Sequence, residues 1–163
     1  MKTILLVRHA KSSWENFSVD DRERPLNPRG KRDAPEMARR LLKKNILIDA
    51  FLSSPALRAK TTAEYFAEEY EMNKNKIIIV PELYMANNEA FINTIRHAPA
   101  DADIIAIFSH NNGITEFANT LTDTRIDHMP TCSVFAITAD IRSWSDFKPG
   151  ANRFFFFEQP KKP

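Results

Sequence analysis

Four short apolar runs, separated and followed by segments of helical periodicity, constrain the fold of this chain most strongly. Each run is apolar on both faces and rich in Ile, Leu, Val or Phe, as in buried parallel strands; the runs are residues 2–7, 49–53, 76–80 and 103–108. The helical segments lie near residues 28–42, 54–66, 88–97 and 112–121. Alternating strands and helices predict a three-layer α/β/α sandwich with a mainly parallel sheet.

The sequence also places two helix starts. Asn27 can cap and Pro28 can open the first helix. Pro35 interrupts the pattern that follows, so it either kinks this helix or marks its true start. Ser54-Pro55 is expected to open the next helix. The inner side of that helix is expected to include Leu57, Thr61, Ala63, Tyr65 and Phe66.

The C-terminal part of the chain predicts two further strands, over residues 133–138 and 153–158, which could run antiparallel to the others. The second contains Phe154–Phe157, whose rings must alternate between the two faces of a sheet. We expect helices to cover both faces; the alternative is that one pair of rings forms part of a dimer contact. No repeat or linker interrupts the 163 residues, so the sequence predicts one domain spanning 1–163.

Composition indicates an ordinary globular protein. Hydrophobic residues make up 43% and charged residues 27% of the chain. The net charge of +2 comes from 23 basic and 21 acidic residues, a balance that argues against nucleic-acid binding. Nine basic residues crowd positions 22–44. They form either a solvated helix face or a positive field that attracts anionic substrates.

The single cysteine, Cys132, cannot form an intrachain disulfide, which favours a cytoplasmic location. We expect Cys132 to be an inert core residue.

The apolar stretch before Arg8 is too short for the core of a signal peptide, and no run approaches membrane-spanning length. We therefore expect no membrane partner. The oligomeric state is expected to be a monomer or a weak dimer.

Polar residues follow three of the predicted strands. Arg8 and His9 come after the first, Arg58 follows the second by a few residues, and His110 follows the last. In an open parallel sheet the carboxyl ends of strands meet at the edge where ligands bind. Guanidinium groups match the oxygens of a phosphoryl group, and imidazole can attack phosphorus. The sequence therefore predicts phosphoryl chemistry at this edge.

These motifs resemble those of the histidine phosphatase superfamily, which includes cofactor-dependent phosphoglycerate mutase. The signature is Leu6-Val7-Arg8-His9-Ala10, and the longer segments 8–14 and 24–30 are similar to the small SixA-like branch of phosphohistidine phosphatases. Ser54-Pro55 with Arg58 matches the second family block, and Ser109-His110 matches the third. The resemblance implies a phosphoglycerate mutase-like fold and the activity of a phosphatase.

The resemblance also implies roles for individual residues. His9 would be the nucleophile that becomes phosphohistidine, Arg8 and Arg58 would bind the phosphoryl oxygens, and His110 would complete the pocket. Ser12 and Arg24 are weaker candidates for substrate binding, since Ser12 could equally serve a turn. No metal ion or other cofactor is expected, because the arginines already supply positive charge.

The chain departs from these relatives in two places. Ala10 stands where glycine is usual, which indicates that the backbone needs no positive φ there. The interval between the second and third blocks lacks the usual motif for a general acid and offers only Glu82 and Glu89. An open site with weak acid catalysis suits phosphohistidine on a protein better than a phosphate ester, because imidazole leaves more easily than an alkoxide.

Other functions stay open at this point. A phosphatase of small phosphate esters would use the same residues. A phosphomutase is disfavoured because the chain lacks the insertion that would close the pocket. A catalytically silent phosphate-binding or protein-binding module would not need the nucleophile His9. A metal site on His9 and His110 is disfavoured because no carboxylate accompanies either histidine.

Overall fold

The computed structural model describes residues 1–15 and 18–161. A six-stranded sheet runs through the molecule in the order β3-β2-β4-β1-β5-β6. Its strands are β1 (Lys2–Arg8), β2 (Ala50–Ser53), β3 (Ile78–Ile79), β4 (Ile104–Ser109), β5 (Val134–Ala139) and β6 (Arg153–Glu158). The strands from β1 to β4 pair in parallel, whereas β5 is antiparallel to β1 and β6 is antiparallel to β5. The mainly parallel sheet with an antiparallel strand near the C-terminus is confirmed.

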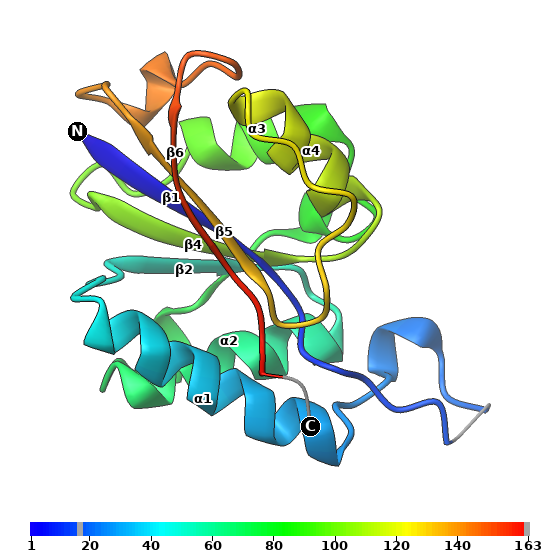
Figure 1. The fold of residues 1–163 in the computed structure, drawn as a ribbon. Helices are drawn as coiled ribbons and strands as arrows, with labels where there is room; N and C mark the ends of the chain where they lie inside the picture. The colour runs from blue at the N-terminus through cyan, green and yellow to red at the C-terminus, as the bar shows by residue number, and fades with distance from the viewer. Residues whose placement is uncertain (16–17, 162–163) are drawn as a thin grey trace.

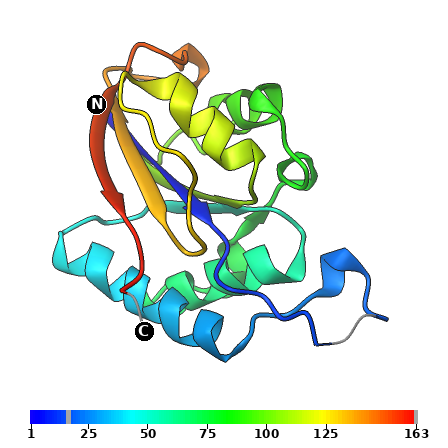
Figure 2. The ribbon, with the colours of Figure 1, turned by 45° about the vertical axis from the view of Figure 1, so that its right-hand side comes forward.

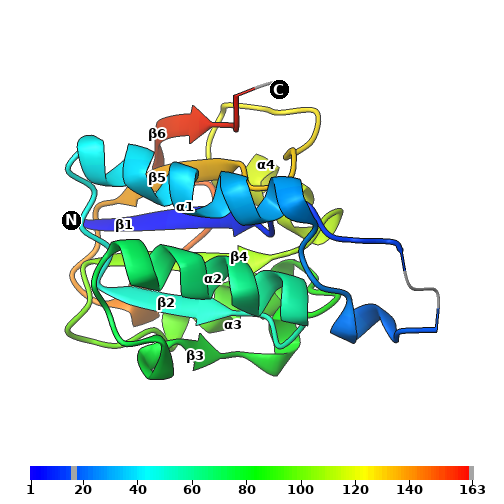
Figure 3. The same ribbon diagram turned by 90° about the horizontal axis from the view of Figure 1, so that it is seen from below.

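Helices cover both faces of the sheet and give the predicted three layers (Figures 1 and 2). On one face lie α1 (Pro28–Lys43) and α2 (Leu57–Glu69), which run side by side along the direction of the strands (Figure 3). On the other face lie α3 (Asn88–Arg96) and α4 (Gly113–Leu121). Short 3-10 helices form at η1 (Asp21–Glu23), η2 (Lys74–Lys76), η3 (Pro81–Leu83) and η4 (Trp144–Asp146). Within the described ranges, no helix is both long and apolar enough to cross a membrane.

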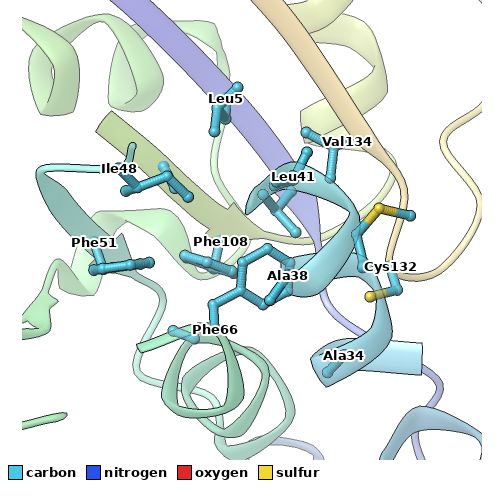
Figure 4. Close-up of a cluster of buried hydrophobic side chains, with 14 of the residues drawn as sticks. Leu5, Ala34, Ala38, Leu41, Ile48, Phe51, Phe66, Phe108, Cys132 and Val134 are labelled. Carbon is cyan, nitrogen blue, oxygen red and sulfur yellow. The ribbon is translucent and has the colours of Figure 1, made fainter. Parts of the chain in front are cut away.

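Two apolar clusters form the core, one on each face of the sheet. Because side chains alternate along a strand, Leu5 of β1 faces α1 and α2 while Leu6 faces the opposite layer. Figure 4 shows part of the first cluster, where the rings of Phe66 and Phe108 meet edge to face with centroids 5.1 Å apart. Cys132 is buried in this cluster with its thiol free, as predicted for a core residue.

The helix starts differ in how well the sequence predicted them. α1 begins at Pro28, and the Asn27 side chain accepts a hydrogen bond from the Gly30 N–H, so Pro35 lies inside the helix and does not mark its start. α2 begins only at Leu57 because Ala56 is still extended. The predicted inner side of α2 is therefore partly wrong. Its buried residues are Arg58, Ala59, Thr62, Ala63, Phe66 and Ala67.

Two predicted strands are less buried than expected because they lie at the edges of the sheet. β3 has only two residues, and Ile78 and Ile79 are 38% and 39% exposed, since 3-10 helices on both sides shorten it. In β6, Phe156 and Phe157 pack against the two core clusters, but Phe154 and Phe155 stay 40% and 46% exposed. The expectation that helices cover the whole phenylalanine run is therefore wrong, and the dimer contact stays a prediction.

The first turn of α1 lies against the segment that follows β1. The Asn27 N–H donates to the Lys11 carbonyl over 3.0 Å, and the Ser13 N–H donates to the Pro25 carbonyl over 2.8 Å. Gly30 allows this approach, because a Cβ at this position would lie 2.2 Å from the Lys11 carbonyl oxygen. The contact fixes the chain just beyond His9.

We predict that Gly30→Ala destabilises the protein by roughly 1–3 kcal/mol, because the added methyl group must push two backbone segments apart. This loss outweighs the better helix propensity of alanine. Urea unfolding measures the change. Lys31→Ala, at an exposed position in the same turn, is the matched control and should stay within roughly 0.5 kcal/mol of wild type. A Gly30→Ala protein as stable as wild type would contradict the close approach.

Candidate active site

Three strands end at one edge of the sheet and bring the predicted site residues together. β1 continues into His9 and β4 into His110, while β2 leads through Ser54 to Arg58 in the first turn of α2. The adjacent order β2-β4-β1 holds these ends side by side. The His9 N–H donates to the Ser109 carbonyl over 3.1 Å, and the two imidazole centroids lie 5.2 Å apart.

A cavity of about 180 Å³ opens at this edge. All six residues that the sequence singled out line it, and the described lining is Arg8, His9, Lys11, Ser12, Trp14, Arg24, Arg58, His110, Asn111 and Thr131. Four of these side chains are cationic and none of the described lining is acidic. The candidate acids lie elsewhere: Glu82 lines a different hollow beside β3, and Glu89 is exposed in the first turn of α3.

His9 is buried and held as the neutral imidazole. Its Nδ1 lies 2.7 Å from the Ala10 carbonyl oxygen, which can only accept, so Nδ1 carries the ring hydrogen and Nε2 keeps a free lone pair. Burial lowers the pKa of His9 to about 3; the bond to Ala10 opposes this shift, while His110, Arg58 and Arg8 add to it. Near pH 7, Nε2 is therefore an unprotonated nucleophile.

His110 is also buried and neutral, because burial first and the charge of Arg58 second lower its pKa to about 3. Its Nε2 lies 2.7 Å from the Ser54 hydroxyl oxygen. That oxygen also accepts the Ala56 N–H over 3.2 Å, so the hydroxyl hydrogen is available to Nε2. A hydroxyl hydrogen donated to Nε2 leaves the ring hydrogen of His110 on Nδ1.

Three residues that line the cavity each hold a buried nitrogen without a hydrogen-bond partner. These atoms are Nε of Arg8, Nε of Arg58 and Nδ1 of His110. Nearly all buried donors in proteins have a hydrogen-bond partner, and leaving one without a partner costs roughly 1–3 kcal/mol of stability. The side chains of Arg8, Arg58 and His110 come from three different segments and line one small cationic cavity, which can bind an anion.

Asp21, in η1, holds Arg24 and Arg58 in position by hydrogen bonds. Its carboxylate accepts hydrogen bonds from Arg58 Nη2 over 3.0 Å, Arg24 Nε over 3.1 Å and the Tyr84 hydroxyl over 2.6 Å. Its backbone carbonyl accepts a further bond from Arg58 Nη1 over 2.7 Å. The bond from Tyr84 is the main cause that lowers the pKa of Asp21 to about 2, followed among the favourable causes by Arg58. The carboxylate therefore stays ionised.

Asp21 and Tyr84 also lie next to the site, although the sequence does not predict either of them as a site residue. An acidic residue directly before the arginine-rich segment at 22–24 was the only local signal. Arg24 and Ser12 also bond to each other, since Arg24 Nη1 donates to the Ser12 hydroxyl over 2.9 Å. Ser12 thus supports Arg24 at the cavity wall.

This chain is similar to known proteins in both sequence and fold. The family model for the histidine phosphatase superfamily (branch 1) matches residues 4–85, about half of the chain, and this segment contains Arg8, His9 and Arg58. An uncharacterized chloroplastic protein of Arabidopsis thaliana is 29% identical over 154 residues, which cover 89% of this chain and 70% of the relative.

Two solved structures share the fold. One comes from Agrobacterium tumefaciens and is assigned as the phosphohistidine phosphatase SixA; it has a TM-score of 0.81 at 21% identity, over 98% of this chain and 99% of that one. The other is the protein histidine phosphatase SixA complexed with tungstate, with a TM-score of 0.81 at 20% identity, over 97% of each chain. These likenesses confirm the predicted phosphoglycerate mutase-like fold. With the match of the family model, they show that the chain belongs to the histidine phosphatase superfamily and is a phosphatase.

Proposed function

We propose that this protein is a metal-independent phosphatase that forms phosphohistidine on His9 and removes phosphoryl groups from phosphohistidine side chains of proteins. One observation carries the proposal. The free lone pair of His9 Nε2 shares a cavity with residues that hold three buried, unpaired nitrogens, on Arg8, Arg58 and His110. A nucleophile that shares a cavity with two arginines and a second histidine suits transfer of a group whose charge lies on three oxygens.

The reaction follows from these roles. The lone pair of His9 Nε2 attacks phosphorus, the P–N bond of the substrate breaks, and the leaving imidazole keeps the electron pair and takes a proton from solvent. Arg8, Arg58 and His110 stabilise the oxygens of the transferring group. A water molecule then attacks the phosphorus on His9, the P–Nε2 bond breaks and its electron pair returns to Nε2. The two hydrogens of the water leave with the phosphate.

The described lining of the cavity favours phosphohistidine over a phosphate ester. An alkoxide leaving group needs a proton donor, whereas imidazole leaves readily. The lining contains no acidic side chain, and the Asp21 carboxylate, which is not among the described lining residues, is ionised and bonded to three groups. The cavity is also smaller than the roughly 300–1,000 Å³ typical of sites that enclose a small molecule, so it suits a phosphoryl group whose carrier is only partly enclosed.

The central test is whether His9 carries the phosphoryl group. A peptide with labelled phosphohistidine, rapidly quenched during turnover, should leave an acid-labile and base-stable label on wild-type protein, and chelator should not change the rate. His9→Ala should lose both label and turnover. His97→Ala, an exposed histidine outside the cavity, is the matched control and should behave as wild type. Normal turnover by His9→Ala would refute the mechanism. Equal rates on an O-phosphoserine peptide would instead favour general ester hydrolysis.

Asp21 should act as a positioning residue for Arg58 and Arg24. Asp21→Asn removes the charge that strengthens these bonds, so we expect kcat/KM to fall roughly five- to thirtyfold, mainly through a higher KM. Steady-state kinetics with both parameters resolved will measure this. Asp20→Asn changes the adjacent exposed carboxylate and should leave the kinetics unchanged. If the two variants behave alike, Asp21 does not position the arginines.

Protonation of His9 should also make stability depend on pH. The pKa of His9 is about 3 in the folded protein and near the ordinary 6.5 in the unfolded chain. The unfolded chain therefore takes up a proton first as pH falls, and stability declines between about pH 6.5 and 3, by about 1.4 kcal/mol per pH unit for this histidine. Denaturant unfolding from pH 7 to 4 should show a shallower decline for His9→Gln than for wild type. Parallel curves would contradict the neutral, buried imidazole.

A further inference from the structure

Trp14 lines the cavity and has a large apolar side chain that is nevertheless mostly exposed to solvent. The residue is 62% exposed, and it lies at the cavity without belonging to either core cluster. The Arg24 guanidinium covers the ring, with its central carbon 3.5 Å from the ring centroid. Trp14 therefore rests on a cation and leaves much of its surface open beside the place where phosphorus would react.

Arg24 is a fixed support for this ring. It is buried, and it donates to the Ser12 hydroxyl over 2.9 Å and to the Asp21 carboxylate over 3.1 Å. Asp21 is held in turn by Arg58 and Tyr84. The position of the indole is thus coupled to the residues that surround the phosphoryl group, although the indole is not buried.

The size of the cavity decides what can meet the indole. About 180 Å³ is room for a phosphoryl group and for part of the group that carries it, so that group extends from the phosphorus toward the mouth of the cavity. Trp14 is part of this mouth. Flat rings gain more from contact with an aromatic face than aliphatic chains of similar size, and the negative face of indole also attracts a protonated imidazole.

We infer that Trp14 determines specificity by binding the flat aromatic group that carries the phosphoryl group. The identity of this group as the imidazole of phosphohistidine rests on the proposed function. The preference for a flat group over an aliphatic one rests on the geometry of Trp14, Arg24 and the cavity alone.

The test compares three phosphorylated compounds: a phosphohistidine peptide, an aryl phosphate and an O-phosphoserine peptide. Trp14→Ala should raise KM roughly three- to tenfold for the first two and change it less than twofold for the third. Trp14→Phe, which keeps an aromatic ring, should have KM values close to those of wild type. Phe155→Ala removes an exposed ring outside the cavity and should change none of the three. Thermal unfolding of each variant confirms that the fold is kept.

Each outcome decides the inference. An equal rise in KM for all three compounds would make Trp14 a structural support only, and no rise for any would remove it from the site; both results overturn the inference. If wild type hydrolyses the aryl and serine compounds but not phosphohistidine, the proposed function fails. The role of Trp14 is then decided by whether Trp14→Ala raises KM more for the aryl phosphate than for the O-phosphoserine peptide.

Discussion

Parallel pairing of β1 with β4 and of β4 with β2 sets Arg8 opposite Ser109 and Ser53 opposite Phe108. The next residues along these strands include His9, Ser54 and His110, so the register alone brings the two imidazoles to a centroid distance of 5.2 Å. A strand slipped by one residue would turn its side chains to the other face of the sheet and separate these groups. The buried apolar clusters on both faces prevent such a slip, because it would expose them.

The charges of the site are arranged so that histidine stays neutral among arginines. Burial and the nearby guanidinium groups both disfavour imidazolium, which keeps the lone pair of His9 Nε2 available. The arginines themselves would repel one another without compensation. Asp21 supplies it by accepting bonds from Arg58 and Arg24, and it is not among the described residues that line the cavity. The described lining holds four cationic side chains and no acidic one, so it attracts a phosphoryl group.

The described parts of the segment between β1 and α1, residues 9–15 and 18–27, extend beyond the carboxyl ends of the strands (Figure 2), and Ser12, Trp14 and Arg24 on them line the cavity. Its two ends are fixed by the pairing of Ser12 with Leu26 and by the close approach of Gly30 to Lys11. Arg24 and Trp14 lie on this segment, so the part of the chain that we propose contacts the carrier of the phosphoryl group is anchored next to His9. In this proposal, residues at and just after the strand ends bind the phosphoryl group, and this segment binds the group that bears it.

The sequence by itself determined the order of strands and helices and the convergence of Arg8, His9, Arg58 and His110. Such features follow from local periodicity and from the rule that parallel strands end together. Only the tertiary structure decided the start of α1 at Pro28, the tautomer of His9, the bonds that Asp21 accepts from Arg58 and Tyr84, and the exposure of β3 and β6. These depend on contacts between segments far apart in the chain; Asp21 and Tyr84, for example, are 63 residues apart. A local sequence pattern carries no information on which distant residues make contact, since these contacts depend on how the packed layers bring loops together.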